Sequence, residues 1–287
     1  MTHYIMAVIY DDLGQIDNAI QEYRRALKID DKSAIIHLNL AASFIRNSDA
    51  PSAIKELKIV ENLEPVALEP HAILALLYAS QNKTDLAAYE YQVALEKASR
   101  LNPKSVEVYK SLGLLYLRQK RFKDAENSFR LIISLSPDDA EAHFYLAYIY
   151  SELNKNALAE KEIKEAIKLK PDYGAALNFL GYLYLEENSN LQQAESMIRK
   201  ALEMEPNNGA YVDSLGWLYF KKSKFQDALK ELERASTLME DPVIFDHLGD
   251  VYMKLNNREK AKLNWEKSLK LDPVQKEVKV KMQKLVK

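Results

Sequence analysis

Histidines are the residues in this chain that first suggest metal binding or proton transfer. Four of the five histidines occupy the same place in a repeated pattern: His3, His37, His71 and His143. Side chains that recur about 34 residues apart lie on successive structural repeats and do not converge on one ion. We therefore expect these four to be packing residues.

The fifth histidine has a different environment, because His247 stands between Asp246 and Asp250 on one predicted helix. A three-residue spacing puts His247 and Asp250 on the same helix face, as a pair of metal ligands would require. Two ligands from one helix make only part of a site. We favour a surface salt bridge or a peptide contact for His247.

Other patterns typical of enzymes are missing from the sequence. No two carboxylates share an identifiable apolar pocket, as general acid and base catalysis requires. None of the seven glycines belongs to a phosphate-binding loop, and the absence of cysteine removes thiol chemistry. We predict a protein that is not an enzyme, with no catalytic residue, no metal and no cofactor.

The helices that must position these residues are predicted by a repeat. An alanine recurs with gaps of 33 to 38 residues, at Ala19, Ala53, Ala87, Ala125, Ala159, Ala194, Ala228 and Ala261. An aromatic residue precedes each alanine, a small residue precedes each aromatic, and a larger hydrophobic residue follows each alanine. The offsets of three, four and seven fit one helix face, so each copy predicts two antiparallel helices.

This pattern resembles the tetratricopeptide repeat (TPR), whose length is about 34 residues. The stretch Leu215-Gly216-Trp217-Leu218-Tyr219, followed by Ala228 and Ala235, is close to that pattern. The resemblance implies an all-α fold, a right-handed TPR superhelix (α-solenoid) with a concave groove formed mainly by the first helix of each repeat. We expect one elongated domain with eight repeats and a C-terminal capping helix. The predicted boundaries are 1–33, 34–67, 68–105, 106–139, 140–173, 174–208, 209–241 and 242–273, with the cap at 274–287.

Composition narrows the class of partner. A formal net charge of −2 and a pI near 6.3 argue against nucleic-acid binding, which normally requires a basic face. No apolar run is long enough to span a membrane. Met1 falls inside the first repeat and leaves no room for a cap, so we expect an upstream segment, which could also carry an export signal or a lipid anchor. The sequence does not decide the compartment. With such a signal we expect the bacterial periplasm or envelope, and without it the cytoplasm.

The groove positions of the TPR pattern predict the binding surface. They are aromatic in repeats five to seven and acidic in repeat eight, and exposed apolar rows commonly mark a partner site. The predicted peptide-binding groove residues are Phe144, Tyr145, Tyr148, Asn178, Phe179, Tyr182, Asp213, Ser214, Trp217, Phe220, Asp246 and Asp250. We expect a bound peptide to be apolar in its middle and basic near Asp246 and Asp250. The alternative is that the aromatics close the inner face or contact an adjacent helix.

The second half also resembles a bacterial envelope-associated TPR group, in the stretches Ser214-Leu215-Gly216-Trp217 and His247-Leu248-Gly249-Asp250. We therefore predict a scaffold or adaptor that binds another protein, with a role in bacterial envelope or secretion-complex assembly. Two alternatives stay open. One is a self-assembling, homo-oligomeric module, and the other is an accessory domain of a larger enzyme or secretion component.

Overall fold

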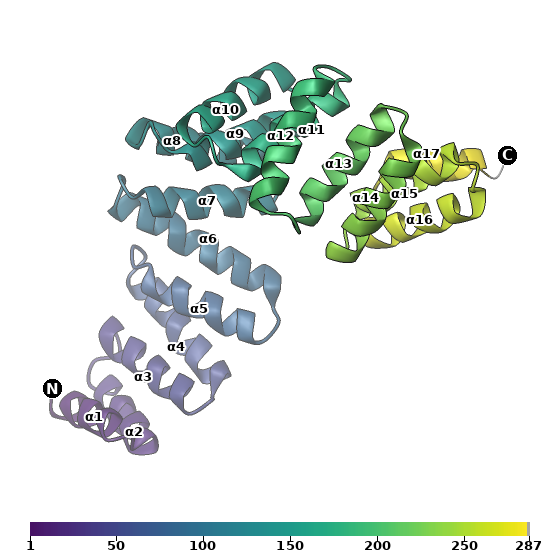
Figure 1. The fold of residues 1–287 in the computed structure, drawn as a ribbon. Coiled ribbons are helices and arrows are strands. Elements are labelled where there is room, and N and C mark those ends of the chain that lie inside the picture. The colour runs from purple at the N-terminus through teal and green to yellow at the C-terminus, as the bar shows by residue number, and fades with distance from the viewer. Residues whose placement is uncertain (286–287) are drawn as a thin grey trace. The chain divides into compact units, whose positions relative to one another are not determined.

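The computed structural model describes residues 1–285 and confirms the all-α prediction (Figure 1). Seventeen α-helices and no β-strand occur in this described part. The helices follow one another in antiparallel pairs, one pair for each predicted repeat. The chain divides into two compact units, Met1–Leu135 and Ser136–Lys287.

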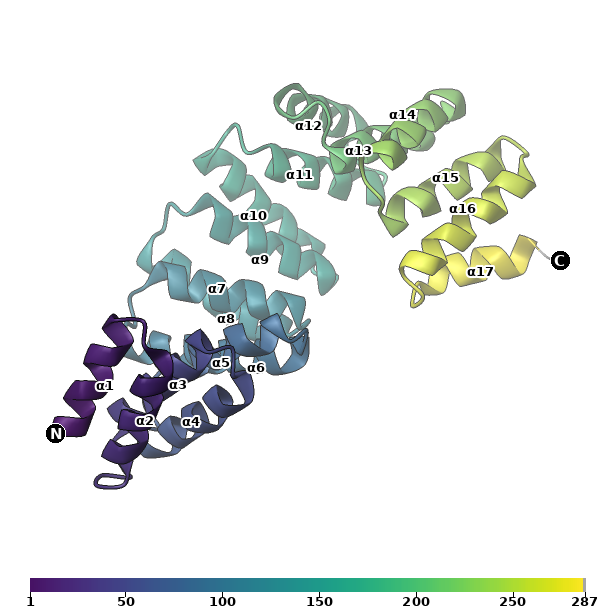
Figure 2. The same cartoon turned by 90° about the horizontal axis from the view of Figure 1, so that it is seen from below.

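The helix bounds place the repeats in the two units. The first unit contains α1 (Thr2–Asp12), α2 (Ile16–Leu27), α3 (Ala34–Arg46), α4 (Ala50–Leu63), α5 (Glu69–Ser80), α6 (Thr84–Leu101), α7 (Val106–Arg118) and α8 (Phe122–Leu135). The second unit contains α9 (Ala140–Glu152), α10 (Asn156–Leu169), α11 (Gly174–Glu186), α12 (Leu191–Met204), α13 (Gly209–Lys221), α14 (Phe225–Leu238), α15 (Pro242–Lys254), α16 (Arg258–Leu271) and α17 (Lys276–Leu285). α16 packs against both α15 and α17, as Figure 2 shows at the C-terminal end.

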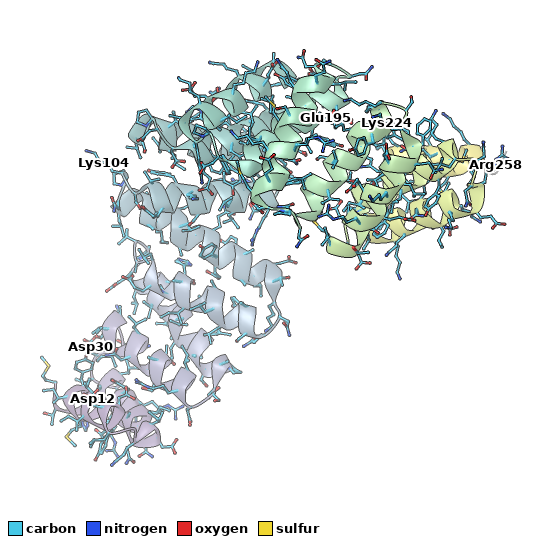
Figure 3. All side chains as sticks on the ribbon, in the orientation of Figure 1. Asp12, Asp30, Lys104, Glu195, Lys224 and Arg258 are labelled. Carbon is cyan, nitrogen blue, oxygen red and sulfur yellow. The ribbon has the colours of Figure 1, made fainter. Side chains whose placement is uncertain are left out.

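The turn inside each pair is closed by the carbonyl of the repeated aromatic residue. The Tyr78 carbonyl accepts a hydrogen bond from the backbone N–H of Lys83 at 2.9 Å. Asn82, the residue just before Lys83, has a φ of 57°. This left-handed residue and the bond that returns to the last turn are a common way to end a helix. The corresponding turns of two later pairs, α13–α14 and α15–α16, leave Lys224 and Arg258 exposed; both are labelled in Figure 3.

The core of each pair forms where the small residue of the first helix meets the large residue of the second. Seven of the eight periodic alanines have no exposed surface, and Ala87 is the exception. A Cβ added to Gly249 would lie 2.3 Å from Nε1 of Trp265, and one added to Gly216 would lie 2.6 Å from Cγ of Leu232. Glycine is therefore required at both crossings because any side chain would overlap its neighbour.

The third repeat departs from this packing. Its second helix, α6, has 18 residues where α4 and α8 have 14, which agrees with the four extra residues in the sequence. Tyr91 of α6 is 45% exposed although the corresponding Leu57 is fully buried, and Glu90 is 4% exposed instead. α6 thus exposes the large residue that other repeats bury, and it buries more deeply the glutamate that is partly buried at the same position of other repeats, as at Glu56.

Candidate functional site

The predicted groove residues lie on the first helices of four successive repeats, all in the second unit. α9 provides Phe144, Tyr145 and Tyr148, α11 provides Asn178, Phe179 and Tyr182, α13 provides Asp213, Ser214, Trp217 and Phe220, and α15 provides Asp246 and Asp250. Because residues three and four apart share a helix face, each helix presents its members together. The contacts described next show which of these members are accessible.

An accessible aromatic patch is formed by Phe144, Tyr145, Tyr148 and Phe179 of α9 and α11. The Phe144 ring centroid lies 5.4 Å from that of Tyr145 and 6.0 Å from that of Phe179. Both pairs meet edge to face, an arrangement that aromatic rings favour. Phe144, Tyr145 and Phe179 are half-buried, whereas Tyr148 is 38% exposed. This patch therefore offers aromatic surface to a partner.

Trp217 is not an exposed member of the row. Its indole is only 8% exposed and lies between two parallel rings, Phe220 at 4.5 Å and His247 at 4.0 Å between centroids. The indole Nε1 donates a hydrogen bond to Oε1 of Glu186 at 2.8 Å. The prediction that Trp217 faces solvent is wrong, because the first helices of the neighbouring repeats, α11 and α15, come close enough to enclose it. We call these first helices the inner helices, and the surface that they form the inner face.

His247 is likewise buried and is not a surface residue. It is 4% exposed, and its Nδ1 lies 2.9 Å from Oδ1 of Asp213, which is 6% exposed. Burial alone would lower the pKa of His247, but the carboxylates of Asp213, Asp246 and Asp250 together outweigh burial, so the net effect is a raised pKa. Asp213 is thus the counter-ion of His247 and is not open to a peptide.

Ser214 has no exposed hydroxyl for a partner either. The residue is 2% exposed, and its Oγ donates to the carbonyl oxygen of Ala210 at 3.0 Å. This bond to the preceding turn is a frequent way for a helical serine to satisfy its hydroxyl. The predicted exposure of Ser214 is therefore wrong as well.

The acidic end of the predicted groove is occupied by the capping helix. Nζ of Lys281, on α17, lies 2.7 Å from Oδ1 of Asp246 and 2.8 Å from Oδ2 of Asp250. Burial raises the pKa of Asp250, and the Lys281 ammonium acts in the opposite direction. The expected basic end of a bound peptide is replaced here by a lysine of the chain itself.

Asn178 is the polar groove residue that keeps an unused hydrogen-bonding group. Its Oδ1 is buried and has no hydrogen-bond partner among the described residues. A buried amide oxygen without a partner costs free energy, so a donor from a ligand would be stabilising there. Asn178 shares α11 with Phe179, a member of the aromatic patch.

The four in-register histidines form one repeated contact. In each case Nδ1 lies 2.6 or 2.7 Å from a glutamate nineteen residues later, in the pairs His3–Glu22, His37–Glu56, His71–Glu90 and His143–Glu162. Each pair joins the two helices of one repeat. The pairs confirm that one side-chain role is repeated, and they add the glutamate partner that the sequence argument missed.

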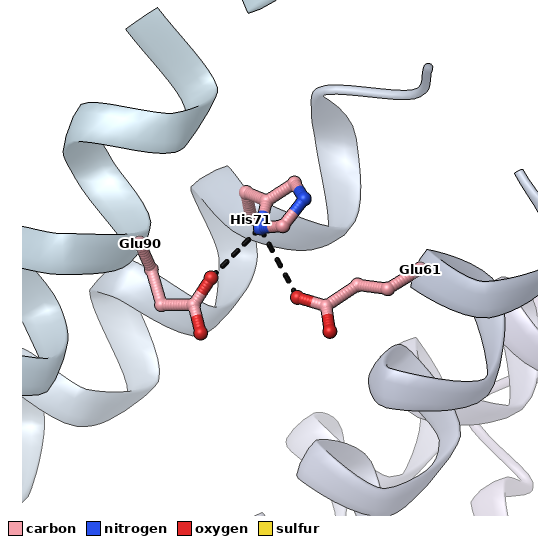
Figure 4. A group of neighbouring side chains, drawn as sticks. All are labelled: Glu61, His71 and Glu90. Carbon is pink, nitrogen blue, oxygen red and sulfur yellow. Dashed lines mark hydrogen bonds and ion pairs between the residues drawn. The ribbon is translucent and has the colours of Figure 1, made fainter. Parts of the chain in front are cut away.

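One of these pairs has a third member. Oε1 of Glu61, on α4, lies 3.1 Å from Nδ1 of His71, on the opposite side from Glu90 (Figure 4). Burial raises the pKa of Glu61, and the Glu90 carboxylate raises it further by repulsion. This cluster was not predicted, because Glu61 belongs to a different repeat from His71.

The comparison with known families decides the class. The sequence matches the family model described as the cilia and flagella-associated protein 70 C-terminal domain, a TPR domain, over residues 2–213. A tetratricopeptide repeat model matches residues 244–275. The chain belongs to the tetratricopeptide-repeat family. No curated protein sequence matches this TPR protein.

Solved structures with the same fold include bacterial proteins. A tetratricopeptide repeat protein from Parabacteroides merdae is 17% identical with a TM-score of 0.67, over 88% of this chain and 99% of that one. PilF of Pseudomonas aeruginosa is 17% identical with a TM-score of 0.55, over 76% of this chain and 97% of that one. PilW, described as a widely conserved type IV pilus biogenesis factor, is 18% identical with a TM-score of 0.58, over 77% of this chain and 98% of that one. These likenesses show the shared fold.

The TPR protein also has an apolar groove that sequence reasoning missed, in its first unit. It has a volume of about 420 Å³ and lies between α5, α6 and α7. Leu76, 74% exposed, and Tyr91, 45% exposed, are among its lining residues. Among the helices of the described residues, none is long and apolar enough to cross a membrane.

Proposed function

We propose that this protein is a scaffold that binds a peptide segment of a partner protein on the inner face of its second unit. TPR proteins generally serve as non-catalytic scaffolds for protein interactions. The accessible aromatic patch on α9 and α11 is the surface that carries the proposal, with Tyr148 as its most exposed member. Tyrosine gives a large contact area at low entropic cost, which is why it is common in binding hot spots.

Polar recognition comes from Asn178. Its unpartnered Oδ1 is an acceptor beside the aromatic patch, and an extended peptide presents N–H donors along its backbone. Because Oδ1 is buried, a peptide N–H reaches it only when the Asn178 side chain turns outward, and the bond would then satisfy a group that the folded chain leaves unsatisfied. The proposed ligand is therefore an extended segment with apolar side chains, and it needs no basic residue because Lys281 already pairs with Asp246 and Asp250.

The buried residues of the predicted groove hold α11, one of the two helices of the patch, against α13 and α15. The parallel rings of Phe220, Trp217 and His247 join α13 to α15, and the Trp217–Glu186 bond joins α13 to α11. Side chains that are held by packing and hydrogen bonds lose little further freedom on binding. These residues are positioning residues, which act by fixing α11, the helix that carries Asn178, Phe179 and Tyr182.

We propose that the partner belongs to a bacterial envelope or secretion complex. The Ser-Leu-Gly-Trp and His-Leu-Gly-Asp stretches support this setting, and PilW, a pilus biogenesis factor by its description, has the same fold. The function is assembly of proteins and not catalysis.

A photocrosslinking experiment tests the proposed face. The chain has no cysteine, so a photoreactive probe can be attached at one introduced cysteine. Glu152→Cys places the probe on α9, one turn after Tyr148, and Lys161→Cys places it at an exposed position of α10. We expect a partner protein to crosslink to the first variant and not to the second. Equal crosslinking from both positions, or crosslinks only between copies of this chain, would contradict the proposal.

A further inference from the structure

The Glu61, His71 and Glu90 side chains converge from three helices of the first unit, α4, α5 and α6 (Figure 4). Nδ1 of His71 lies 2.7 Å from Oε2 of Glu90 and 3.1 Å from Oε1 of Glu61. One nitrogen and one oxygen from each carboxylate all lie within 4.8 Å of one another. This donor set differs from every other histidine pair in the described chain.

The other in-register histidines show what a purely structural pair looks like. His37 bonds to Glu56 and His143 to Glu162 with nearly the same distances as His71 to Glu90. Ten residues before His71 stands Glu61, whereas the corresponding positions before His37 and His143 are apolar, Leu27 and Ile133. The repeated packing role is therefore fulfilled without a second carboxylate, so Glu61 needs a separate explanation.

Hydrogen bonding within the cluster cannot satisfy both carboxylates. An imidazole Nδ1 carries at most one proton and donates it to one acceptor at full strength. Glu90 receives the shorter contact, and Oε1 of Glu61 is a buried oxygen without a hydrogen-bond partner. Glu90 itself is 4% exposed, so two carboxylates face one nitrogen in a largely desolvated space. Such an arrangement is costly unless a cation lies between the groups.

We propose that Glu61, His71 and Glu90 bind a divalent transition-metal cation such as Zn²⁺. Zinc binds imidazole nitrogen and carboxylate oxygen at about 2.0 to 2.2 Å, which corresponds to ligand-to-ligand separations of about 3.3 Å in a tetrahedron. The observed 2.7 and 3.1 Å separations reach that value with small side-chain rotations. Three protein ligands leave the fourth position to water, and an imidazole in the set favours zinc over magnesium or calcium.

The role of the ion follows from where its ligands lie. α4 belongs to the second repeat, while α5 and α6 form the third, so the ion joins two repeats. The third repeat is also the one in which Ala87 and Tyr91 are not fully buried. A metal that binds only the folded state stabilises it by mass action. The site therefore acts as a structural link at the most openly packed repeat of the first unit.

Zinc titration of the chelator-treated protein tests the site. Wild type and Glu61→Leu, which copies the residue at the corresponding position of the preceding repeat, are titrated with Zn²⁺ against a chromogenic chelator. We expect Glu61→Leu to weaken Zn²⁺ binding roughly tenfold or more, since even indirect partners of metal ligands contribute that much. His37→Gln, which removes a histidine from a pair without a third carboxylate, should bind Zn²⁺ like the wild type.

Thermal unfolding of the same proteins gives a second readout. Zn²⁺ should raise the unfolding temperature of wild type and His37→Gln but not that of Glu61→Leu or Glu61→Gln. The Gln variant keeps the size of the side chain and covers the case in which leucine disturbs folding. Equal Zn²⁺ affinity in wild type and both Glu61 variants would overturn the proposal, and so would competition by Mg²⁺ at equal concentration.

Discussion

The imidazole of His247 lies parallel to the indole of Trp217, with ring centroids 4.0 Å apart and 11° between the planes. The two rings come from adjacent inner helices, α15 and α13, and both are almost fully buried. The contact therefore belongs to the core that holds these helices together, and it explains why the aromatic row in the sequence is only partly a surface.

Replacing Trp217 should lower the stability of the second unit, because Trp217 is a core residue and does not contact a partner directly. Trp217→Ala removes a buried indole, its stacking on two rings and its bond to Glu186, and we expect a loss of roughly 3 to 5 kcal/mol. Urea denaturation followed by circular dichroism measures this loss. A variant as stable as the wild type would contradict the packing described for Trp217.

The pair between His247 and Asp213 predicts a pH dependence of stability. The pKa of His247 is raised in the folded chain above its usual value of about 6.5. The stability from the charged pair is thus complete below pH about 6.5 and is lost as pH rises through the folded pKa. The acidic groups around it are Asp213, Asp246 and Asp250.

Denaturation of wild type and His247→Gln at several pH values checks this dependence. The difference in unfolding free energy between the two proteins should be larger at pH about 6 than at pH about 8. A difference that does not change would show that folding leaves the pKa of His247 at its usual value, and a difference that grows with pH would show that folding lowers it; either result would contradict the raised pKa.

The glycine at the crossing of α15 and α16 should not tolerate a methyl group. In Gly249→Ala the new Cβ would overlap the Trp265 ring, and we expect a loss of about 1 to 3 kcal/mol from overpacking. Gly174→Ala is the matched control, because its Cβ would meet no atom closer than 3.3 Å. Denaturation curves of both variants and the wild type measure the effect. The unfolding free energy of Gly249→Ala should fall by more than that of Gly174→Ala.

Among the described residues of the capping helix, Lys281 makes the charged contacts, so the docking of α17 should depend on it. Lys281→Ala leaves Asp246 and Asp250 without their ammonium partner, and we expect a loss of about 1 to 3 kcal/mol. Hydrogen exchange of the α17 amides should become faster in this variant. Lys279→Ala, at an exposed position of the same helix, should leave the exchange of α17 unchanged.

Most of the fold could be predicted from the sequence because each repeat has the same local pattern. The spacing from Gly249 to Trp265 already predicts which residues of α15 and α16 must touch, and the contact is found. The site was harder to predict. A helical repeat predicts which face carries Trp217 and Asp246, but it does not predict how near the next helix lies. The burial of Trp217 and the contact of Lys281 with Asp246 were therefore not predicted.

The cluster of Glu61, His71 and Glu90 could not be predicted for the same reason. His71 was correctly assigned to a repeated contact, yet Glu61 lies in another repeat and at a position that is apolar in the pairs around His37 and His143. An alignment of the repeats shows Glu61 only as a departure from the usual apolar residue. That Glu61 contacts His71 becomes evident only from the distance between their side chains on α4 and α5.

The affinity of a crosslinked partner segment for Tyr148→Ala tests the central claim most directly. Tyr89→Ala is the control, since Tyr89 is an exposed tyrosine, 62% accessible, in the first unit. In calorimetric titrations we expect Tyr148→Ala to lose about 2 kcal/mol or more of binding free energy and Tyr89→Ala to bind like the wild type. Unchanged affinity of Tyr148→Ala, or an equal loss in both variants, would contradict binding on the inner face of the second unit.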